Sequence, residues 1–123
     1  MNNKFYSFEK LEEIAQGDNA FVQELVNTFI ETVSVEVKNI QRLMNAGEWK
    51  TIGGIAHKLA SNYAYMDAES LYTLAINIEK KVQSCDLTEI TEMTHKMCAD
   101  SLVLISELKK NLINNYKNES ADL

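Results

Sequence analysis

One histidine in this chain stands among unusually small neighbours. On a helical wheel at about 100° per residue, residues 49–66 gather an apolar stripe, and His57 lies roughly 150° from its centre. Its imidazole, a nitrogen nucleophile, should therefore face solvent. Glycines inside a helix cost about 1 kcal/mol each relative to alanine, which indicates that the small residues leave room for a second protein's active site. The neighbours one or two turns away are Gly53, Gly54, Ala60, Ser61 and Ala64.

Other residues with possible chemistry carry weaker signals. Glu92 and His95 have the Glu-x-x-His spacing of di-iron bundles, but such a site needs that motif twice and further glutamates. We interpret His95 as a surface residue and Trp49 as a packing residue. Cys85 and Cys98 form no CxxC motif, and we expect two reduced structural thiols.

The hydrophobic pattern predicts five helices that would position His57. Apolar residues recur every three or four positions along each predicted segment, as one buried stripe requires. Side chains that can cap the helices precede four of these segments, namely Ser7, Asp18, Asp67 and Asp86, the last as part of a capping box ending at Glu89. The segments run over about 8–15, 19–46 and 49–65, then from Asp67 past Val82, and from Asp86 past Leu112.

These segments predict an all-α fold. Long helices with short connections pack against their neighbours, so we expect an antiparallel four-helix bundle with a short additional N-terminal helix. The composition agrees, with 46% hydrophobic residues, no proline and only four glycines. We expect one domain over residues 1–115 and a polar, fraying tail over 116–123.

The charge pattern argues against several classes of partner. Twelve basic and eighteen acidic residues give a net charge of −6, and the basic residues do not cluster, so nucleic acid is not an expected partner. The sequence has no secretory signal and no apolar stretch near the roughly 20 residues of a membrane span. We expect a cytoplasmic, monomeric protein without membrane association.

The order and spacing of several motifs resemble histidine-containing phosphotransfer (HPt) domains. The central motif, Ala56-His57-Lys58-Leu59, is similar to the family's AHxLKG, and a Gly-Glu pair precedes it as in the family. The opening after Gly17-Asp18 resembles "GD..fl.ELl..F", and the stretch from Ala68 to Glu79 resembles "GA..L......lE". The resemblance covers about residues 7–110.

The resemblance implies a phosphocarrier rather than an autonomous enzyme. His57 would accept a phosphoryl group from an aspartate of a response-regulator receiver domain and pass it to another. The implied partners are receiver domains and a hybrid sensor histidine kinase. The chain would need no cofactor of its own, because the receiver would bring the aspartate and Mg²⁺. No Asp or Glu is expected beside His57 on the exposed face of its own helix, which favours this division of labour.

Two departures from the family pattern concern the surroundings of His57. The family's lysine three residues after the histidine is Ala60 here, and its following glycine is Ser61. Lys50, about two turns before His57, is our candidate for orienting the phosphoryl group. The alternative is an HPt-like interaction module that binds a receiver or a kinase without being phosphorylated. The predicted receiver-docking surface consists of Gly53, Gly54, Lys58, Ala60, Ser61 and Ala64.

Overall fold

The computed structural model describes residues 6–121, with side chains through Asn111, and this part of the chain forms five helices. The first three agree with the predicted segments to within a residue or two. α4 and α5 begin later than the pattern predicts, and α5 extends well beyond Leu112. The helices are α1 (Glu9–Ala15), α2 (Asn19–Ala46), α3 (Trp49–Tyr65), α4 (Glu69–Gln83) and α5 (Ile90–Ala121).

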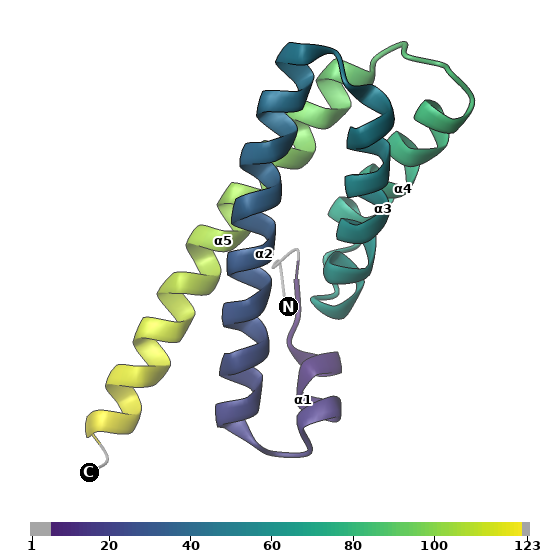
Figure 1. Cartoon of the computed structure of the whole chain (residues 1–123). Coiled ribbons are helices and arrows are strands. Elements are labelled where there is room, and N and C mark those ends of the chain that lie inside the picture. The colour runs from purple at the N-terminus through teal and green to yellow at the C-terminus, as the bar shows by residue number, and fades with distance from the viewer. Residues whose placement is uncertain (1–5, 122–123) are drawn as a thin grey trace.

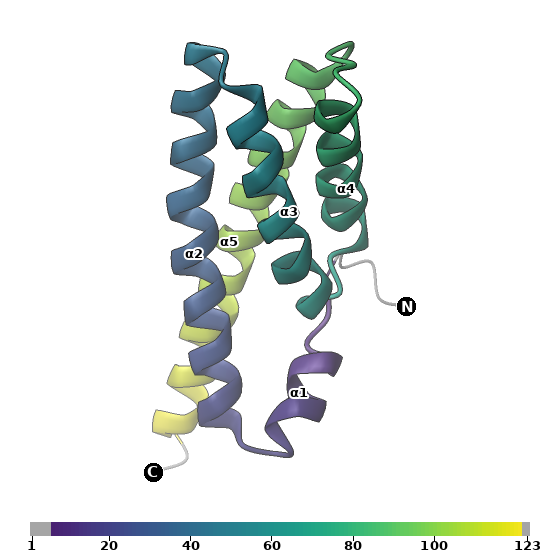
Figure 2. The same ribbon diagram turned by 45° about the vertical axis from the view of Figure 1, so that its right-hand side comes forward.

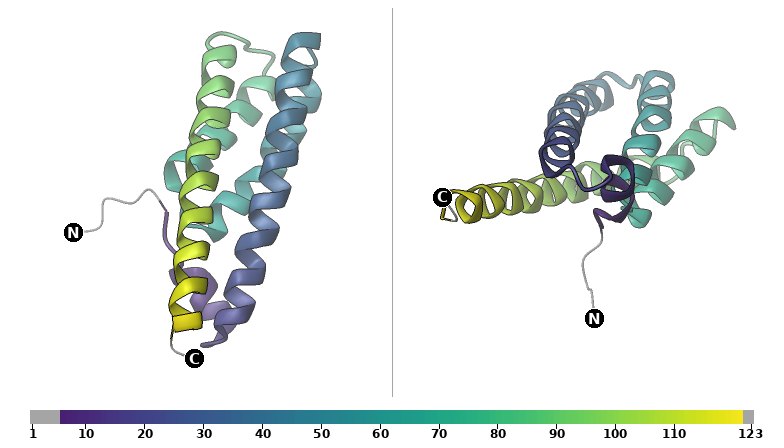
Figure 3. Two further views of the ribbon diagram at one scale, coloured as in Figure 1. Left: turned by 90° about the vertical axis from the view of Figure 1, so that its left-hand side faces the viewer. Right: turned by 90° about the horizontal axis from the view of Figure 1, so that it is seen from below.

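Helices α2 to α5 form an antiparallel bundle (Figures 1 and 2). Each packs on the next along the chain, and α5 also packs on α2, which closes the ring (Figure 3). The most extensive of these contacts joins α3 to α4. Helix α1 packs on α2 at the end of the bundle where α3 ends (Figure 1). The predicted all-α four-helix bundle with a short N-terminal helix is therefore confirmed.

The cap of α2 is confirmed, because the Asp18 carboxylate accepts a hydrogen bond from the N–H of Phe21 at 3.1 Å. At α1 the N-cap position is Phe8, without a side-chain cap, so the predicted Ser7 cap is wrong; the Ser7 hydroxyl accepts a hydrogen bond from the N–H of Glu9 just before the helix. Gly47 ends α2 with a φ of 72°, a left-handed conformation that suits glycine. These local signals place the first three helices correctly.

The predicted caps of α4 and α5 are wrong. Asp67 adopts a φ of 52° and forms an ion pair with Lys10 at 3.1 Å, so that Ala68 occupies the N-cap position of α4. Asp86 accepts a hydrogen bond from the backbone N–H of Thr88, and the left-handed Glu89 follows before α5 begins. Both aspartates therefore stabilise turns that precede the helix rather than its first turn.

The predicted end of the last helix is also wrong. The backbone of α5 remains helical through Ala121, beyond the polar boundary near residue 115. Side chains after Asn111 lie outside the described residues, so the division into a domain and a tail stays a prediction. Within the described part of the chain, no helix combines the length and apolarity needed to cross a lipid bilayer.

The core fixes the orientation of α3. Its buried stripe includes Ile52, Ala56, Leu59 and Tyr63, as the wheel predicts. The Tyr63 hydroxyl lies 2.7 Å from the Ser101 hydroxyl on α5, and burial raises the pKa of this tyrosine. At the far end of α3, the N–H of Ser7 donates to the carbonyl of the Met66 C-cap. With one face held in the core, the opposite face of α3 is presented to solvent.

The paired glycines of α3 should respond oppositely to alanine. A Cβ at Gly53 would approach the Val82 Cγ1 atom to 2.9 Å, whereas a Cβ at Gly54 would meet nothing within 4 Å. We expect Gly54→Ala to raise the free energy of unfolding by about 0.5–1 kcal/mol, because alanine favours a helix. Gly53→Ala should lower it by about 1 kcal/mol, because overpacking outweighs that gain. Urea denaturation of both variants measures the difference, and a change of the same sign in both would contradict this account of α3–α4 packing.

Candidate functional site

His57 lies on the solvent side of α3, with 71% of its side chain exposed. Its Nδ1 atom lies 2.5 Å from the Oε2 atom of Glu79 on α4, and only 18% of the Glu79 side chain is exposed. A carboxylate oxygen at this distance accepts a hydrogen bond, which places the ring proton on Nδ1. In a neutral imidazole, Nε2 then holds the unprotonated lone pair. The geometry therefore assigns separate tasks to the two ring nitrogens.

The contact between His57 and Glu79 follows from the close packing of α3 on α4. Gly53 is buried, and a Cβ placed on it would come within 2.9 Å of Val82. His57 is one turn after Gly53, and Glu79 is nearly one turn before Val82. Because the two helices run in opposite directions, these steps lead to the same level of the bundle (Figure 2). The small residue at position 53 thus brings a carboxylate from α4 to the histidine.

The structure divides the six residues of the predicted docking surface into two groups. Gly54, Lys58 and Ser61 are exposed, and Ala64 is half-buried. Gly53 and Ala60 are buried, so the prediction that they belong to an exposed surface is wrong. Their small size serves helix packing, most directly at Gly53. The exposed clearing around His57 is accordingly narrower than the sequence indicates.

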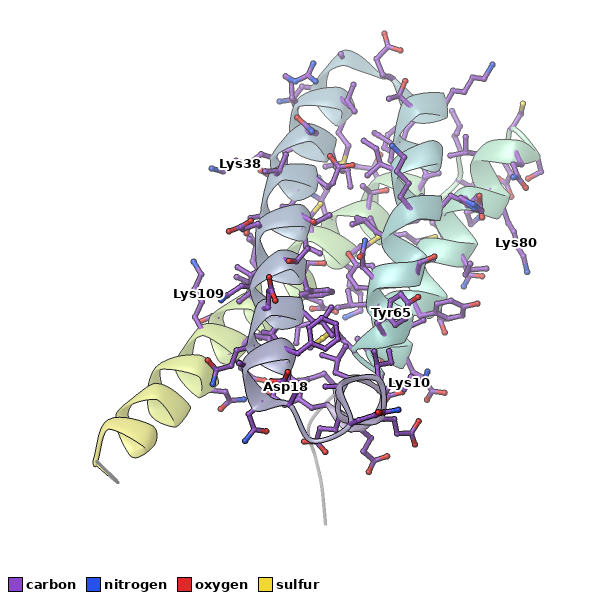
Figure 4. The ribbon with its side chains drawn as sticks, turned by 60° about the horizontal axis from the view of Figure 1, so that its bottom comes forward. Lys10, Asp18, Lys38, Tyr65, Lys80 and Lys109 are labelled. Atoms are coloured by element: carbon purple, nitrogen blue, oxygen red, sulfur yellow. The ribbon has the colours of Figure 1, made fainter. Side chains whose placement is uncertain are left out.

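Lys50 lines a groove between α3 and α4. The groove has a volume of about 560 Å³, and Gly54 and Glu79 also line it. Lys50 is exposed and sits about 10.5 Å before His57 along the helix axis, since His57 is seven positions further along the helix. A different lysine on α4, Lys80, points away from α3 (Figure 4). The lysine that shares a groove with the carboxylate partner of His57 is therefore Lys50.

Of the other residues considered from the sequence, Trp49 and Cys85 line this groove, whereas His95, Glu92 and Cys98 do not. His95 and Glu92 are exposed on α5, and the described residues contain no group of three or more His, Cys, Asp or Glu side chains able to hold a metal ion. Cys85 and Cys98 are both free thiols. Cys98 is buried, and burial raises the pKa of its thiol to about 11. Trp49 is half-buried and packs against the core.

Glu79 is the residue that sequence reasoning missed. From the sequence, acidic neighbours of His57 were considered only on its own helix, where there are none. Glu79 appeared only as the last residue of a motif that resembles the family's. A signal was nevertheless present. Glu79 follows Ala75 and precedes Val82 at helical spacing, so it belongs to the flank of α4 that bears buried and half-buried residues. A carboxylate on such a flank needs a partner, and His57 supplies it.

Comparison with known proteins identifies the family. Residues 24–110 match the model of the Hpt domain. The chain is 28% identical to the virulence sensor protein BvgS of Bordetella bronchiseptica over 106 residues, which cover 85% of this chain and 9% of that protein. The corresponding protein of Bordetella pertussis is 26% identical over the same length. The chain therefore spans about a tenth of the length of these relatives.

A solved structure shows the same fold. The crystal structure of histidine-containing phosphotransfer protein B (HptB) from Pseudomonas aeruginosa PAO1 superposes with a TM-score of 0.78. The match covers 89% of this chain and 96% of that one, at 14% sequence identity. The family match extends over most of the bundle, including α3 with His57 and α4 with Glu79. This chain belongs to the Hpt domain family, the histidine-containing phosphotransfer domains of phosphorelays.

Proposed function

We propose that His57 is the phosphorylated residue of this chain and that it relays a phosphoryl group between receiver domains. The observation that carries this proposal is the contact of Nδ1 with Glu79, which leaves Nε2 as the nucleophilic nitrogen of an exposed ring. The exposed positions at Gly54 and Ser61 supply the clearance that a partner's active site requires. A relay of this kind needs an accessible nucleophile and little else from the carrier.

Phosphoryl transfer from the receiver to His57 requires no proton transfer. The Nε2 lone pair attacks phosphorus, the bond between phosphorus and the receiver's carboxylate oxygen breaks, and the bonding electrons leave with that carboxylate. The imidazole keeps its Nδ1 proton and gains a positive charge, which the Glu79 carboxylate stabilises. Transfer onward to a second receiver reverses these steps. Glu79 thus acts as a positioning residue that fixes the tautomer and opposes the developing charge.

The remaining catalytic groups belong to the partner in this proposal. A receiver domain contributes the aspartate and Mg²⁺, which neutralises charge on the phosphoryl oxygens. Lys50 is our candidate for a further contact with those oxygens. The partners are receiver domains and a hybrid sensor kinase in the cytoplasm, and the chain alone has no catalytic turnover. The docking surface of the proposal is Gly54, Lys58, Ser61 and Ala64.

A transfer assay tests the proposal. A panel of purified receiver domains is phosphorylated with radiolabelled acetyl phosphate in the presence of Mg²⁺, freed of the donor and mixed with this chain. We expect at least one receiver to transfer label that is labile in acid and stable in alkali, the behaviour of a phosphorus–nitrogen bond. A receiver that binds the chain by calorimetry without transferring label would instead establish the interaction module.

A further inference from the structure

We infer that the groove between α3 and α4 is a specificity-determining contact for the receiver domain, taking an apolar side chain that lies beside the receiver's phosphorylatable aspartate. This inference rests on the proposed function and adds the part of the surface by which one receiver is distinguished from another. The lining of the groove includes Trp49, Lys50, Gly54, Glu79, Val82 and Leu87. We call it the α3–α4 groove.

The α3–α4 groove is continuous with the proposed reaction site. Glu79 lines it and also contacts the imidazole of His57. Gly54, one turn from His57, forms part of its wall and has open space where a side chain would stand. A partner that reaches Nε2 therefore meets no side chain at position 54 on its way into the groove.

Apolar side chains on both sides of the groove are partly or largely exposed. Leu87, in the connection between α4 and α5, is 48% exposed, although it belongs to a residue type that is usually buried. Val82 and Trp49 are half-buried beside it, with their remaining surface open to solvent. When a partner excludes water from apolar side chains that line a concave surface, the free energy of the complex is lowered.

A docked receiver is large enough to reach this groove from His57. A standard protein interface covers about 800 Å² on each partner, equivalent to a disc of roughly 16 Å radius. Lys50, which lines the groove, lies only about 10.5 Å from His57 along the helix. A receiver centred on His57 therefore reaches the groove along its α3 side. Its occupant must be mostly apolar, since the charged side chains of the lining are Lys50 and Glu79 alone.

A binding measurement tests this occupant directly. Trp49 is the chain's single tryptophan, so incorporation of 5-fluorotryptophan gives one ¹⁹F resonance, and an unlabelled receiver adds none. Titration with the receiver that binds the chain most tightly by calorimetry should shift this resonance until the receiver saturates the chain. An unchanged resonance at saturation would overturn the inference. Because the titration needs only binding, it tests the groove even where no phosphoryl transfer is detected.

A pair of matched variants separates the groove from a general surface effect. We expect Leu87→Asp to raise the half-saturating receiver concentration about tenfold while the maximal transfer rate stays within about twofold. Leu102→Asp, at a leucine on α5 that is 47% exposed, should leave both quantities unchanged. Equal behaviour of the two variants would overturn the inference, whereas wild-type protein that accepts no label from any receiver would contradict the proposed function instead.

Discussion

A His57→Gln variant is expected to accept no acid-labile, alkali-stable label from any receiver that labels the wild-type protein. Glutamine keeps a polar side chain of similar length, but its amide nitrogen lacks the lone pair with which Nε2 attacks phosphorus. The fold should not change, because 71% of the His57 side chain is exposed and the core stripe of α3 lies on the opposite face. The effect is therefore a complete loss of transfer at unchanged thermal stability, measured by the labelling assay and by circular dichroism.

The second histidine of the chain provides the matched control. His95 is exposed on α5, and we expect His95→Gln to accept label at the wild-type rate. With only two histidines in the sequence, the two variants together account for every possible phosphohistidine. Label that persists in His57→Gln would contradict the proposal, and label lost only in His95→Gln would move the site to α5.

The helices were predictable because their signals are local. The stripe of α2 repeats every three or four residues from Val26 to Leu43, and only one face of a helix satisfies that spacing. The start of α4 was not predictable in this way. Asp67 carries the residue type of a cap, but its ion pair with Lys10 comes from a segment more than fifty residues earlier. A contact between residues so far apart in the sequence cannot be predicted from the local pattern.

The features of the candidate site show the same difference between local signals, which could be predicted, and contacts between helices, which could not. The exposure of His57 follows from the helical wheel alone, and the structure agrees with it. The position of Glu79 depends on how α3 and α4 are aligned along their axes, which is decided by the close approach of Gly53 to Val82. From the sequence, both glycines were assigned to the exposed surface around His57. In the structure, Gly53 allows α3 and α4 to pack closely, whereas Gly54 leaves open space. Side chains from two helices must be placed together before these roles separate.

The sharpest test of the site's chemistry is the pair of substitutions Glu79→Gln and Glu79→Ala. Glutamine retains an oxygen that accepts a hydrogen bond from Nδ1 but removes the charge that opposes the developing imidazolium. We expect its maximal transfer rate to fall about fivefold, because a hydrogen bond to a charged group is worth roughly 1 kcal/mol more than a neutral one. Alanine removes the hydrogen bond as well and should slow transfer about thirtyfold.

The reason for the slower transfer in the Glu79 variants can be tested by NMR without a receiver. In wild-type protein labelled with ¹⁵N at histidine, the neutral ring of His57 should carry its proton on Nδ1, since Glu79 accepts from that atom at 2.5 Å. In Glu79→Ala the proton should move largely to Nε2 and occupy the nucleophilic nitrogen. Glu31→Ala, at an exposed glutamate of α2, is the control and should alter neither the rate nor the tautomer. If transfer slows in Glu79→Ala while the Nδ1 tautomer is retained, the carboxylate acts through its charge alone, and the tautomer argument fails.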